Sequence, residues 1–353
     1  MAFALADRCK EQLDAQISEV IAAGISEFSM TGRTEDFLTP ILPFLRRGKR
    51  TRAAAAAAGW LAAGGEPEPT DALVSLGLAL ELYQAHALIH DDIIDHAATR
   101  RGMPALHVAY SRMHAQSGWT GDAHVYGQAA AILAGDYLLA AACDAAGQAC
   151  RGNDAAWARW STLTREVAVG QQLDVRAEHE SAGPNAVEAA MAVILHKSAR
   201  YSAVHPVALG ALLAGAGPDL VARLDAITTP WGLAFQMRDD DLGVFGNSDV
   251  TGKPSGDDLR EGKRTVLVAL TLKRANSSDA AWLDSHLGRP RLTDDDIERA
   301  RTIITHCGAR AEHEKRIAEY THEGLDALDQ LALPRLGREA CEWLADTLVD
   351  RNA

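Results

Sequence analysis

The chain has little cysteine, few aromatic residues and a shortage of basic side chains. Its five cysteines include no CxxC pair and form an odd set, which disfavours a disulfide framework and indicates reduced thiols in a cytosolic protein. Aromatic residues make up 5% of the chain, whereas alanine, the strongest helix former, is abundant. With 47% hydrophobic residues, the composition predicts an all-α protein with a sizeable core.

The shortage of basic residues limits the partners. Lys and Arg number 35 against 48 Asp and Glu, which gives a formal net charge of −13. This charge argues against nucleic acid, whose binding depends on neutralising phosphates with cations, and it disfavours an anionic membrane surface. An acidic protein that binds a polyanionic substrate must gather its basic residues locally and recruit metal.

Several segment types are also missing. No signal peptide is evident at the N-terminus, and the apolar run Ala129–Ala142 is interrupted by Asp136, so we expect no transmembrane segment. No stretch resembles a linker, and no repeat with a solenoid period is present. Although 353 residues allow two or three domains, we therefore expect one domain over residues 1–353.

Helical periodicity sets the expected elements. Thr70 is the expected N-cap of the helix that leads into the first acidic cluster. Prolines predict a connection over Leu38–Leu45. Glycines predict a loop over Tyr110–Val125, with His114 and His124 at the surface. The apolar pattern predicts further helices over these ranges: Ala4–Ala23, Gly127–Ala149, Ala155–Glu178, Ala186–Leu213 and Leu292–Asn352.

The first acidic cluster ends an otherwise apolar helical stretch that starts near Tyr83. On a helix, Asp91 and Asp95 lie one turn apart on the same face and repel each other. Paired hard oxygens at this spacing suit Mg²⁺ held together with substrate phosphates. The alternative is a solvated helix end, which acidic clusters usually form.

A second acidic cluster favours the metal interpretation. The apolar run from Trp231 to Phe235 leads through Gln236 into three consecutive carboxylates, Asp239, Asp240 and Asp241. Two such clusters, one in each half of the chain, could face each other across a cavity and hold several Mg²⁺ ions between them.

Basic residues gather at two places. The segment Arg46–Arg52 carries five cations around Gly48, just ahead of a predicted helix N-terminus, which favours a phosphate site over a solvated basic turn. Arg100 and Arg101 follow the first acidic cluster directly and can contact phosphate with two N–H groups each. The same two arginines could instead form salt bridges with the nearby carboxylates.

Polar residues interrupt later helical patterns. Gly170–Asp174 suggests a helix face turned toward a wet cavity, and Lys197 within Ala186–Leu213 needs an anion if it points inward. The segment Gly252–Thr265 combines glycines with Lys253 and Lys263, as a closing phosphate lid requires.

Taken together, these residues resemble the trans-isoprenyl diphosphate synthases, also called polyprenyl synthetases, over most of the chain. Seven ordered motifs make a specific signal, whereas any one of them would be weak. They are Arg47–Ala53 for GGKRxRP, Asp91–Asp95 for DDxxD, Arg100–Pro104 for RRGxP, Gly170–Asp174 for GQxxD, Lys197–Ser198 for KT, Phe235–Asp240 for FQxxDD and Gly252–Thr265 for GKxxGxDLxxGKxT.

The resemblance implies an all-α fold of roughly a dozen helices around a deep central cavity, usually as a homodimer. It implies condensation of isopentenyl diphosphate with an allylic diphosphate. Three Mg²⁺ ions would be held by Asp91, Asp95 and Asp239, supported by Asp92 and Asp240. The allylic diphosphate would be held by Arg100, Lys197 and Lys263, and isopentenyl diphosphate by Lys49, Arg50, Arg101, Gln84 and, in the lid, Lys253. Gln236 and Ser198 would aim dipoles at the carbocation.

Four positions depart from the family pattern. Gly243 replaces the last Asp of the second cluster, and Asp241 adds a carboxylate nearby. In the family the first Asp is the main ligand there, so we expect activity to survive. Arg47 replaces the first Gly of GGKR, and Ser198 replaces Thr while retaining the hydroxyl. Gln84 stands where many members have His, and it can still donate a hydrogen bond.

Product length in this family depends on side chains four or five positions before the first cluster, where bulk shortens the product. Ala87 is small, His86 is intermediate and Tyr83 lies about two turns upstream, so we expect geranylgeranyl diphosphate first and farnesyl diphosphate second. A class I terpene cyclase and a non-catalytic partner subunit remain as alternatives. The cations at Lys49, Arg50 and Arg101 argue against the first, and the retention of both acidic clusters argues against the second.

Overall fold

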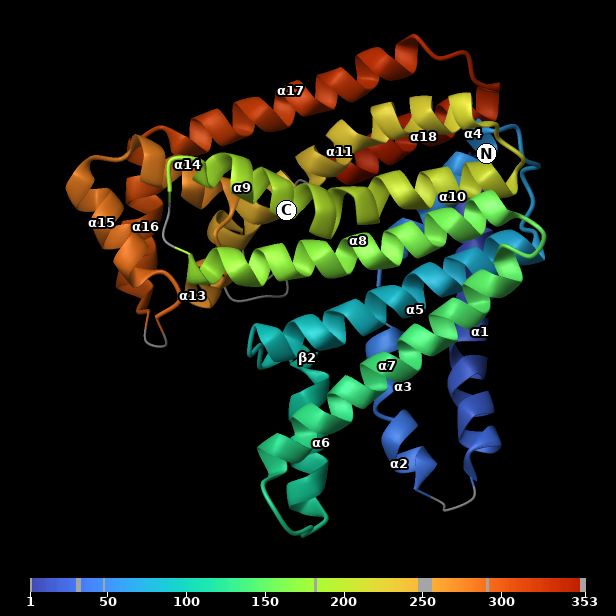
Figure 1. Cartoon of the computed structure of the whole chain (residues 1–353), viewed down its shortest axis with the longest axis horizontal. Coiled ribbons are helices and arrows are strands. Elements are labelled where there is room, and N and C mark those ends of the chain that lie inside the picture. The colour runs from blue at the N-terminus through green and yellow to red at the C-terminus, as the bar shows by residue number, and fades with distance from the viewer. Residues whose placement is uncertain are drawn as a thin grey trace. The chain divides into compact units, whose positions relative to one another are not determined.

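The computed structural model describes residues 2–29, 33–46, 48–180, 183–246, 256–289 and 292–349. Figure 1 shows helices throughout, with a single two-residue hairpin as the only sheet among the described residues. The all-α prediction is confirmed. The residues group into two compact units, Met1–Trp157 with Leu209–Gly215, and Ala158–Ala208 with Ala216–Ala353, and each is described by itself. One domain over the whole chain stays a prediction.

The first unit is built around a pair of long helices, α5 and α7, which pack side by side (Figure 1). Gly135 of α7 permits this, because a Cβ there would overlap the His90 ring of α5. The elements of this unit are α1 (Ala2–Glu27), α2 (Thr34–Leu38), α3 (Ile41–Leu45), α4 (Thr51–Ala62), α5 (Asp71–Ile94), β1 (Thr99–Arg100), β2 (Met103–Pro104), α6 (Leu106–Gln116) and α7 (Ala123–Ala149).

The second unit packs its helices around α11, which contacts η2 and α17 extensively. Its core includes Val266, Leu267 and Ile304, all fully buried. Its elements are most of α8 (Asp154–His179), α9 (Ala186–Val193), the π-helix η2 (Ile194–Val204), α11 (Pro218–Phe245), α13 (Asp257–Glu261), α14 (Val266–Arg274), α15 (Ser277–His286), α16 (Asp294–His306), α17 (Ala309–Asp329) and α18 (Arg335–Val349). Helix α10 (His205–Leu213) begins in this unit and ends in the first.

Side chains cap several helix starts. Thr70 caps α5 by accepting the Leu73 N–H, as predicted, and Thr265, which was not predicted as a cap, caps α14 by accepting the Val268 N–H. The predicted helices over Ala4–Ala23, Gly127–Ala149 and Ala155–Glu178 are α1, α7 and α8.

Two predicted connections are wrong in part. Within Leu38–Leu45, residues Ile41–Leu45 form the short helix α3, because Pro40 and Pro43 stand at its N-cap and in its first turn, where backbone N–H groups have no helical acceptor. Within the predicted loop Tyr110–Val125, α6 continues to Gln116, because Tyr110 and His114 bury one face. His114 is therefore buried rather than at the surface.

The two long helices of the first unit bear on the membrane question. Helices α5 and α7 are both long and apolar enough to cross a membrane by length and composition, and 67% and 44% of their apolar windows are buried in the fold. The apolar run Ala129–Ala142 lies within α7, which is 27 residues long. A buried core helix passes the same test, so this finding does not assign a span.

Candidate functional site

The first acidic cluster lies at the C-terminal end of α5. Asp91 stands in the last turn, and Asp95 caps the helix by donating its backbone N–H to the Asp91 carbonyl at 2.8 Å. Asp92 is fully buried. The helical arrangement that the sequence predicted is therefore present, and Asp91 and Asp95 lie one turn apart.

Arg100 neutralises part of this cluster. Its Nε donates to Asp92 Oδ1 at 2.7 Å, and its Nη2 lies 3.4 Å from Asp91 Oδ2. Of the two interpretations of Arg100, the structure contains the salt bridge. The same contact holds a guanidinium against the edge of the carboxylates, where a diphosphate would meet it.

A tight hairpin turn presents Arg101. Strands β1 and β2 pair through Thr99 with Pro104 and Arg100 with Met103, which leaves Arg101 and Gly102 as the two turn residues. Both have positive φ, 54° and 72°, as a type I′ turn requires. A non-glycine residue in this region is strained, so the geometry at Arg101 indicates a functional constraint.

The basic segment meets this turn. Arg50 has a φ of 55° and begins α4, and Gly48 lies against both arginines: a Cβ there would be 3.3 Å from Arg50 Nη1 and 3.5 Å from Arg101 Nη1. Burial lowers the pKa of Arg101, and the positive charges of Arg50 and Arg100 lower it further. The negative charge of Glu81 acts in the opposite direction. Several guanidinium groups thus converge at one place.

The members of the basic segment differ in their contacts. Arg50 is buried, and its N–H groups already reach Asp14, Glu81 and the Leu45 carbonyl at 2.8–3.2 Å. Its observed contacts are thus structural, whereas Lys49 is exposed. Arg47 lies outside the described residues. The substrate roles of Lys49, Arg50 and Arg101 stay predictions.

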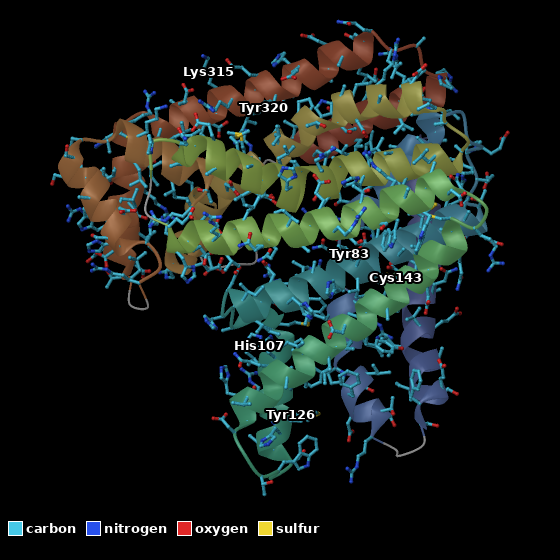
Figure 2. The ribbon with its side chains drawn as sticks, in the orientation of Figure 1. Tyr83, His107, Tyr126, Cys143, Lys315 and Tyr320 are labelled. Carbon is cyan, nitrogen blue, oxygen red and sulfur yellow. The ribbon has the colours of Figure 1, made fainter. Side chains whose placement is uncertain are left out.

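The predicted chain-length residues lie along α5, before the first acidic cluster. Tyr83 is buried beside Cys143 of α7 (Figure 2), and burial raises its pKa. The Nδ1 of His86 lies 3.1 Å from the Gly135 carbonyl, also on α7. Ala87 comes one turn before Asp91 and shares its face. Gln84 is half-buried, and its Oε1 makes no hydrogen bond to any described residue.

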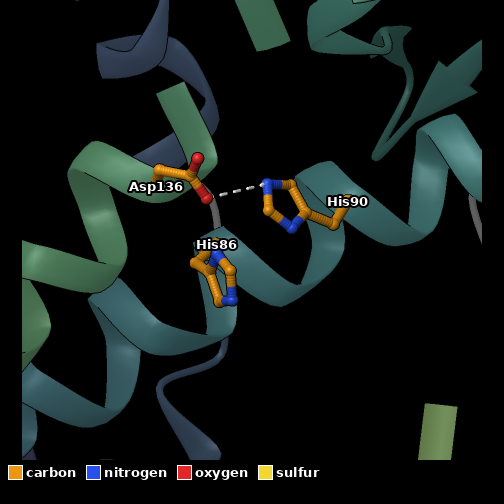
Figure 3. A group of neighbouring side chains, drawn as sticks. All are labelled: His86, His90 and Asp136. Atoms are coloured by element: carbon orange, nitrogen blue, oxygen red, sulfur yellow. Dashed lines mark ion pairs between the residues drawn. The ribbon is translucent and has the colours of Figure 1, made fainter. Parts of the chain in front are cut away.

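His86, His90 and Asp136 cluster between α5 and α7 (Figure 3). One ligand atom from each lies within 4.8 Å of the others, as in a metal site. However, His86 Nδ1 and His90 Nε2 each lie 3.1 Å from a carbonyl of α7, at Gly135 and Ile132, which makes these nitrogens hydrogen-bond donors. Burial is the main cause that lowers the pKa of His86 to about 4, and the neighbouring His90 lowers it further. The cluster is explained as a contact between the helices, in which both imidazoles donate to α7 carbonyls and His90 Nε2 also lies 3.7 Å from Asp136 Oδ1.

In the second unit, η2 carries the predicted catalytic pair. Lys197 Nζ donates to Asp174 of α8, so the lysine points inward and finds the anion that it requires. Ser198 Oγ donates to Gln236 Oε1 on α11, and Gln236 Nε2 donates to Asp240 Oδ1 at 2.8 Å. This chain of hydrogen bonds fixes the orientation of the Gln236 amide.

Within the second acidic cluster, Asp240 is buried among other carboxylates. Asp240 is 5% exposed, and its Oδ2 makes no hydrogen bond to any described residue. Burial, then the negative charge of Asp258, raise its pKa well above the usual value, and Asp239 adds to this while Gln236 and Lys263 oppose it. A divalent cation would remove the repulsion among these carboxylates, so the donor set fits Mg²⁺.

Asp241 does not stand in for the carboxylate missing at Gly243, and the expectation that activity survives stays a prediction. Two residues along a helix lie about half a turn apart, and Asp241 turns to Arg310 of α17, with Nε–Oδ1 and Nη2–Oδ2 both 2.9 Å. Instead Asp258 of α13 occupies the space beside Gly243, since a Cβ at 243 would overlap its carboxylate. Asp258 was missed, although it stands inside the lid motif.

The structure describes the lid motif only from Gly256 to Thr265. Lys263 Nζ lies 2.6 Å from Glu261 and 3.8 Å from Asp258 Oδ1, which places a cation beside the second acidic cluster. Lys253 lies outside the described residues, as does the segment Asn247–Ser255.

Comparison with known proteins agrees with these geometries. The profile of the polyprenyl synthetase family matches residues 37–304. A geranylfarnesyl diphosphate synthase of Aeropyrum pernix is 33% identical over 79% of this chain and 82% of its own length. A (2E,6E)-farnesyl diphosphate synthase of Mycobacterium tuberculosis is 30% identical over 87% of this chain and 80% of its own.

A solved structure is similar throughout. The geranylgeranyl pyrophosphate synthase of Corynebacterium glutamicum, complexed with isoprenyl diphosphate and magnesium, superposes with a TM-score of 0.89. It is 36% identical and covers 98% of this chain and 99% of its own. The relatives share one type of reaction but differ in product length.

Proposed function

Because the chain belongs to the polyprenyl synthetase family and is therefore a trans-prenyltransferase, we propose that it condenses isopentenyl diphosphate with an allylic diphosphate to form geranylgeranyl diphosphate. Farnesyl diphosphate is the second candidate product. The relatives include synthases of both kinds, so the product must be argued from residues of this chain.

The observation that carries the two-substrate reaction is the convergence of cations in the first unit. Arg101 adopts a strained left-handed conformation that brings its guanidinium beside Gly48 and Arg50. Like charges held together in this way favour an anion between them. A terpene cyclase has no second diphosphate to bind, so this feature argues against the cyclase alternative.

Mg²⁺ supplies charge stabilisation for the departing diphosphate, and three ions is the proposed number. Asp91, Asp95 and Asp239 are the proposed main ligands, and Asp92 and Asp240 support them. Asp258 adds a carboxylate at the position that Gly243 leaves empty. Both acidic clusters thus keep the carboxylates proposed to bind Mg²⁺, which argues against a non-catalytic partner subunit.

Fixed cations and dipoles of the chain bind the two substrates and stabilise the charges that develop on them. Arg100, Lys197 and Lys263 hold the allylic diphosphate and stabilise the charge that develops as its C–O bond breaks. The Ser198–Gln236 hydrogen bond presents fixed dipoles to the carbocation. Lys49 and Arg101 orient isopentenyl diphosphate, with Lys253 in the lid, Arg50 behind them and Gln84 as an amide donor.

Product length follows from the sides to which the α5 side chains turn. His86 packs toward α7, whereas the small Ala87 stands one turn before Asp91 on the Asp91 face, with Tyr83 about one turn before Ala87. No bulky side chain lies one turn beneath Asp91 on that face, which supports elongation beyond farnesyl diphosphate.

We also propose a cytoplasmic homodimer. Along α7, Val125, Ile132 and Leu133 expose 62%, 44% and 59% of their surfaces on one face of the helix. An apolar stripe of this kind suits a second copy of the chain. If a second copy covers this face, the low buried fraction of α7 is explained without a membrane.

The test is a product assay with isopentenyl diphosphate, Mg²⁺ and each of dimethylallyl, geranyl and farnesyl diphosphate, read by mass spectrometry. We expect geranylgeranyl diphosphate from the wild type and a shorter product from Ala87→Phe. His86→Ala should leave the distribution unchanged, because His86 packs toward α7, and a longer product from this variant would show that His86 limits the chain. A folded wild type that elongates no primer contradicts the proposal and favours a cyclase or a partner subunit.

A further inference from the structure

The segment that carries Lys197 and Ser198 has an unusual winding. Eleven residues, Ile194–Val204, form the π-helix η2 between α9 and α10. A π-helix closes i→i+5 hydrogen bonds, and in proteins it is usually a single turn. A run of this length therefore requires tertiary contacts that favour it over the α-helix.

One carboxylate makes three such contacts. Glu166 of α8 accepts hydrogen bonds from His196 Nδ1 at 2.6 Å and Arg200 Nη1 at 2.9 Å on Oε1, and from His205 Nε2 at 2.6 Å on Oε2. Its side chain is 12% exposed. Burial acts to raise the Glu166 pKa, but the bonds from His205 and His196 and the Arg200 charge outweigh it and lower the pKa to about 2.

The spacing of the three donors matches only the π winding. They are four and then five residues apart, which is close to the longer turn of a π-helix, so all three can point at one carboxylate. At 3.6 residues per turn, the nine residues from His196 to His205 span two and a half turns. On an α-helix His205 would then face away from Glu166.

The same face of α8 contacts η2 at two further levels. Gly170, one turn after Glu166, lets the backbones touch, because a Cβ there would overlap the Lys197 backbone nitrogen. Asp174, another turn on, accepts the Lys197 ammonium. On the opposite side, a Cβ at Gly232 of α11 would lie 2.6 Å from the Ala199 carbonyl oxygen. The close approach leaves little room for a different winding.

We propose that Glu166 is a positioning residue that locks η2 in the π register and thereby aims Lys197 and Ser198. Without the lock the segment can rewind toward an α-helix. A shift of the winding by one residue turns the side chains that follow by about 100° around the helix axis. Lys197 then leaves Asp174 and Ser198 leaves Gln236. The catalytic consequence rests on the proposed function, whereas the lock itself does not.

Hydrogen exchange read by mass spectrometry tests the lock directly. Glu166→Gln keeps the shape but loses the charge, and we expect faster exchange in peptides covering residues 194–205. Glu166→Asp should recover part of the protection. Glu180→Gln, an exposed carboxylate just past the end of α8 that pairs with Arg176, is the matched control and should exchange like the wild type.

Steady-state kinetics test the consequence. We expect kcat to fall about 10- to 100-fold in Glu166→Gln, as for other residues that orient a catalytic group, with partial recovery in Glu166→Asp. The KM for isopentenyl diphosphate should stay unchanged, because none of its proposed ligands lies on η2. Circular dichroism must show that each variant is folded.

Each outcome decides one claim. Unchanged exchange in a folded Glu166→Gln variant overturns the lock. Faster exchange with unchanged kcat overturns the positioning role. A wild type without prenyltransferase activity overturns the proposed function alone, and the exchange experiment still decides the lock.

Discussion

The two acidic clusters look alike in sequence but differ in their surroundings. Asp92 is fully buried and bound by Arg100, so its charge is matched. Asp240 is almost as buried; burial raises its pKa well above the usual value, and the negative charge of Asp258 raises it further. The first cluster therefore contributes to the stability of the fold through Asp92, whereas Asp240 in the second is repelled by other carboxylates, and a cation would relieve that repulsion.

The largest expected effect is on stability, with opposite signs at the two clusters. Asp92→Asn should lower the free energy of unfolding by about 3 kcal/mol, because it leaves Arg100 with a buried, poorly matched charge. Asp240→Asn should raise the free energy of unfolding of the Mg²⁺-free protein, because it removes a buried repulsive charge. Urea unfolding in EDTA measures both, and a loss of stability in Asp240→Asn would contradict the comparison.

The next effect is on activity, where the clusters should behave alike. Asp91→Asn and Asp239→Asn should each lower kcat by about 10²- to 10³-fold, because each removes charge that stabilises the departing diphosphate. Initial rates with geranyl diphosphate measure this, and Asp144→Asn, an exposed carboxylate on α7, is the control. A much smaller loss in Asp239→Asn would mean that the second cluster does not hold the metal.

Glu166 resembles Asp92 in this comparison, because hydrogen-bond donors of other residues also surround its carboxylate. Its pKa falls from about 4.5 in the unfolded chain to about 2, so its stabilisation is complete above pH 4.5 and lost as pH falls toward 2. The wild-type advantage over Glu166→Gln in urea unfolding should therefore shrink by on the order of 3 kcal/mol across that window. An advantage independent of pH would contradict this assignment.

The smallest expected effect is at Gly243. Gly243→Ala should destabilise the protein by about 1 kcal/mol, because its methyl group displaces the Asp258 carboxylate and this outweighs the gain in helix propensity. Combining it with Asp258→Ala should remove the penalty, since the two residues share one space. Additive losses in thermal unfolding would show that the residues do not compete.

Sequence reasoning identified the local features because they depend on neighbours within a turn or two. Thr70 as N-cap and Asp91 and Asp95 on one face follow from helical spacing. The same reasoning failed where packing overrode local preference: His114 is buried because α6 lays one face on α7. Prolines near Leu38–Leu45 did not prevent helix α3, because they stand at its start.

The sequence by itself determined the all-α fold class, the order of the motifs and the types of side chain available to hold metal and diphosphate. The tertiary structure alone decided which charges meet. Asp241 turns to Arg310 across 69 residues of sequence, Asp258 stands beside Gly243, and Glu166 collects three donors that only a π-helix aligns. Helical period and capping are set by residues one turn apart, whereas the partner of a buried charge is set by the packing of helices that are distant in the chain.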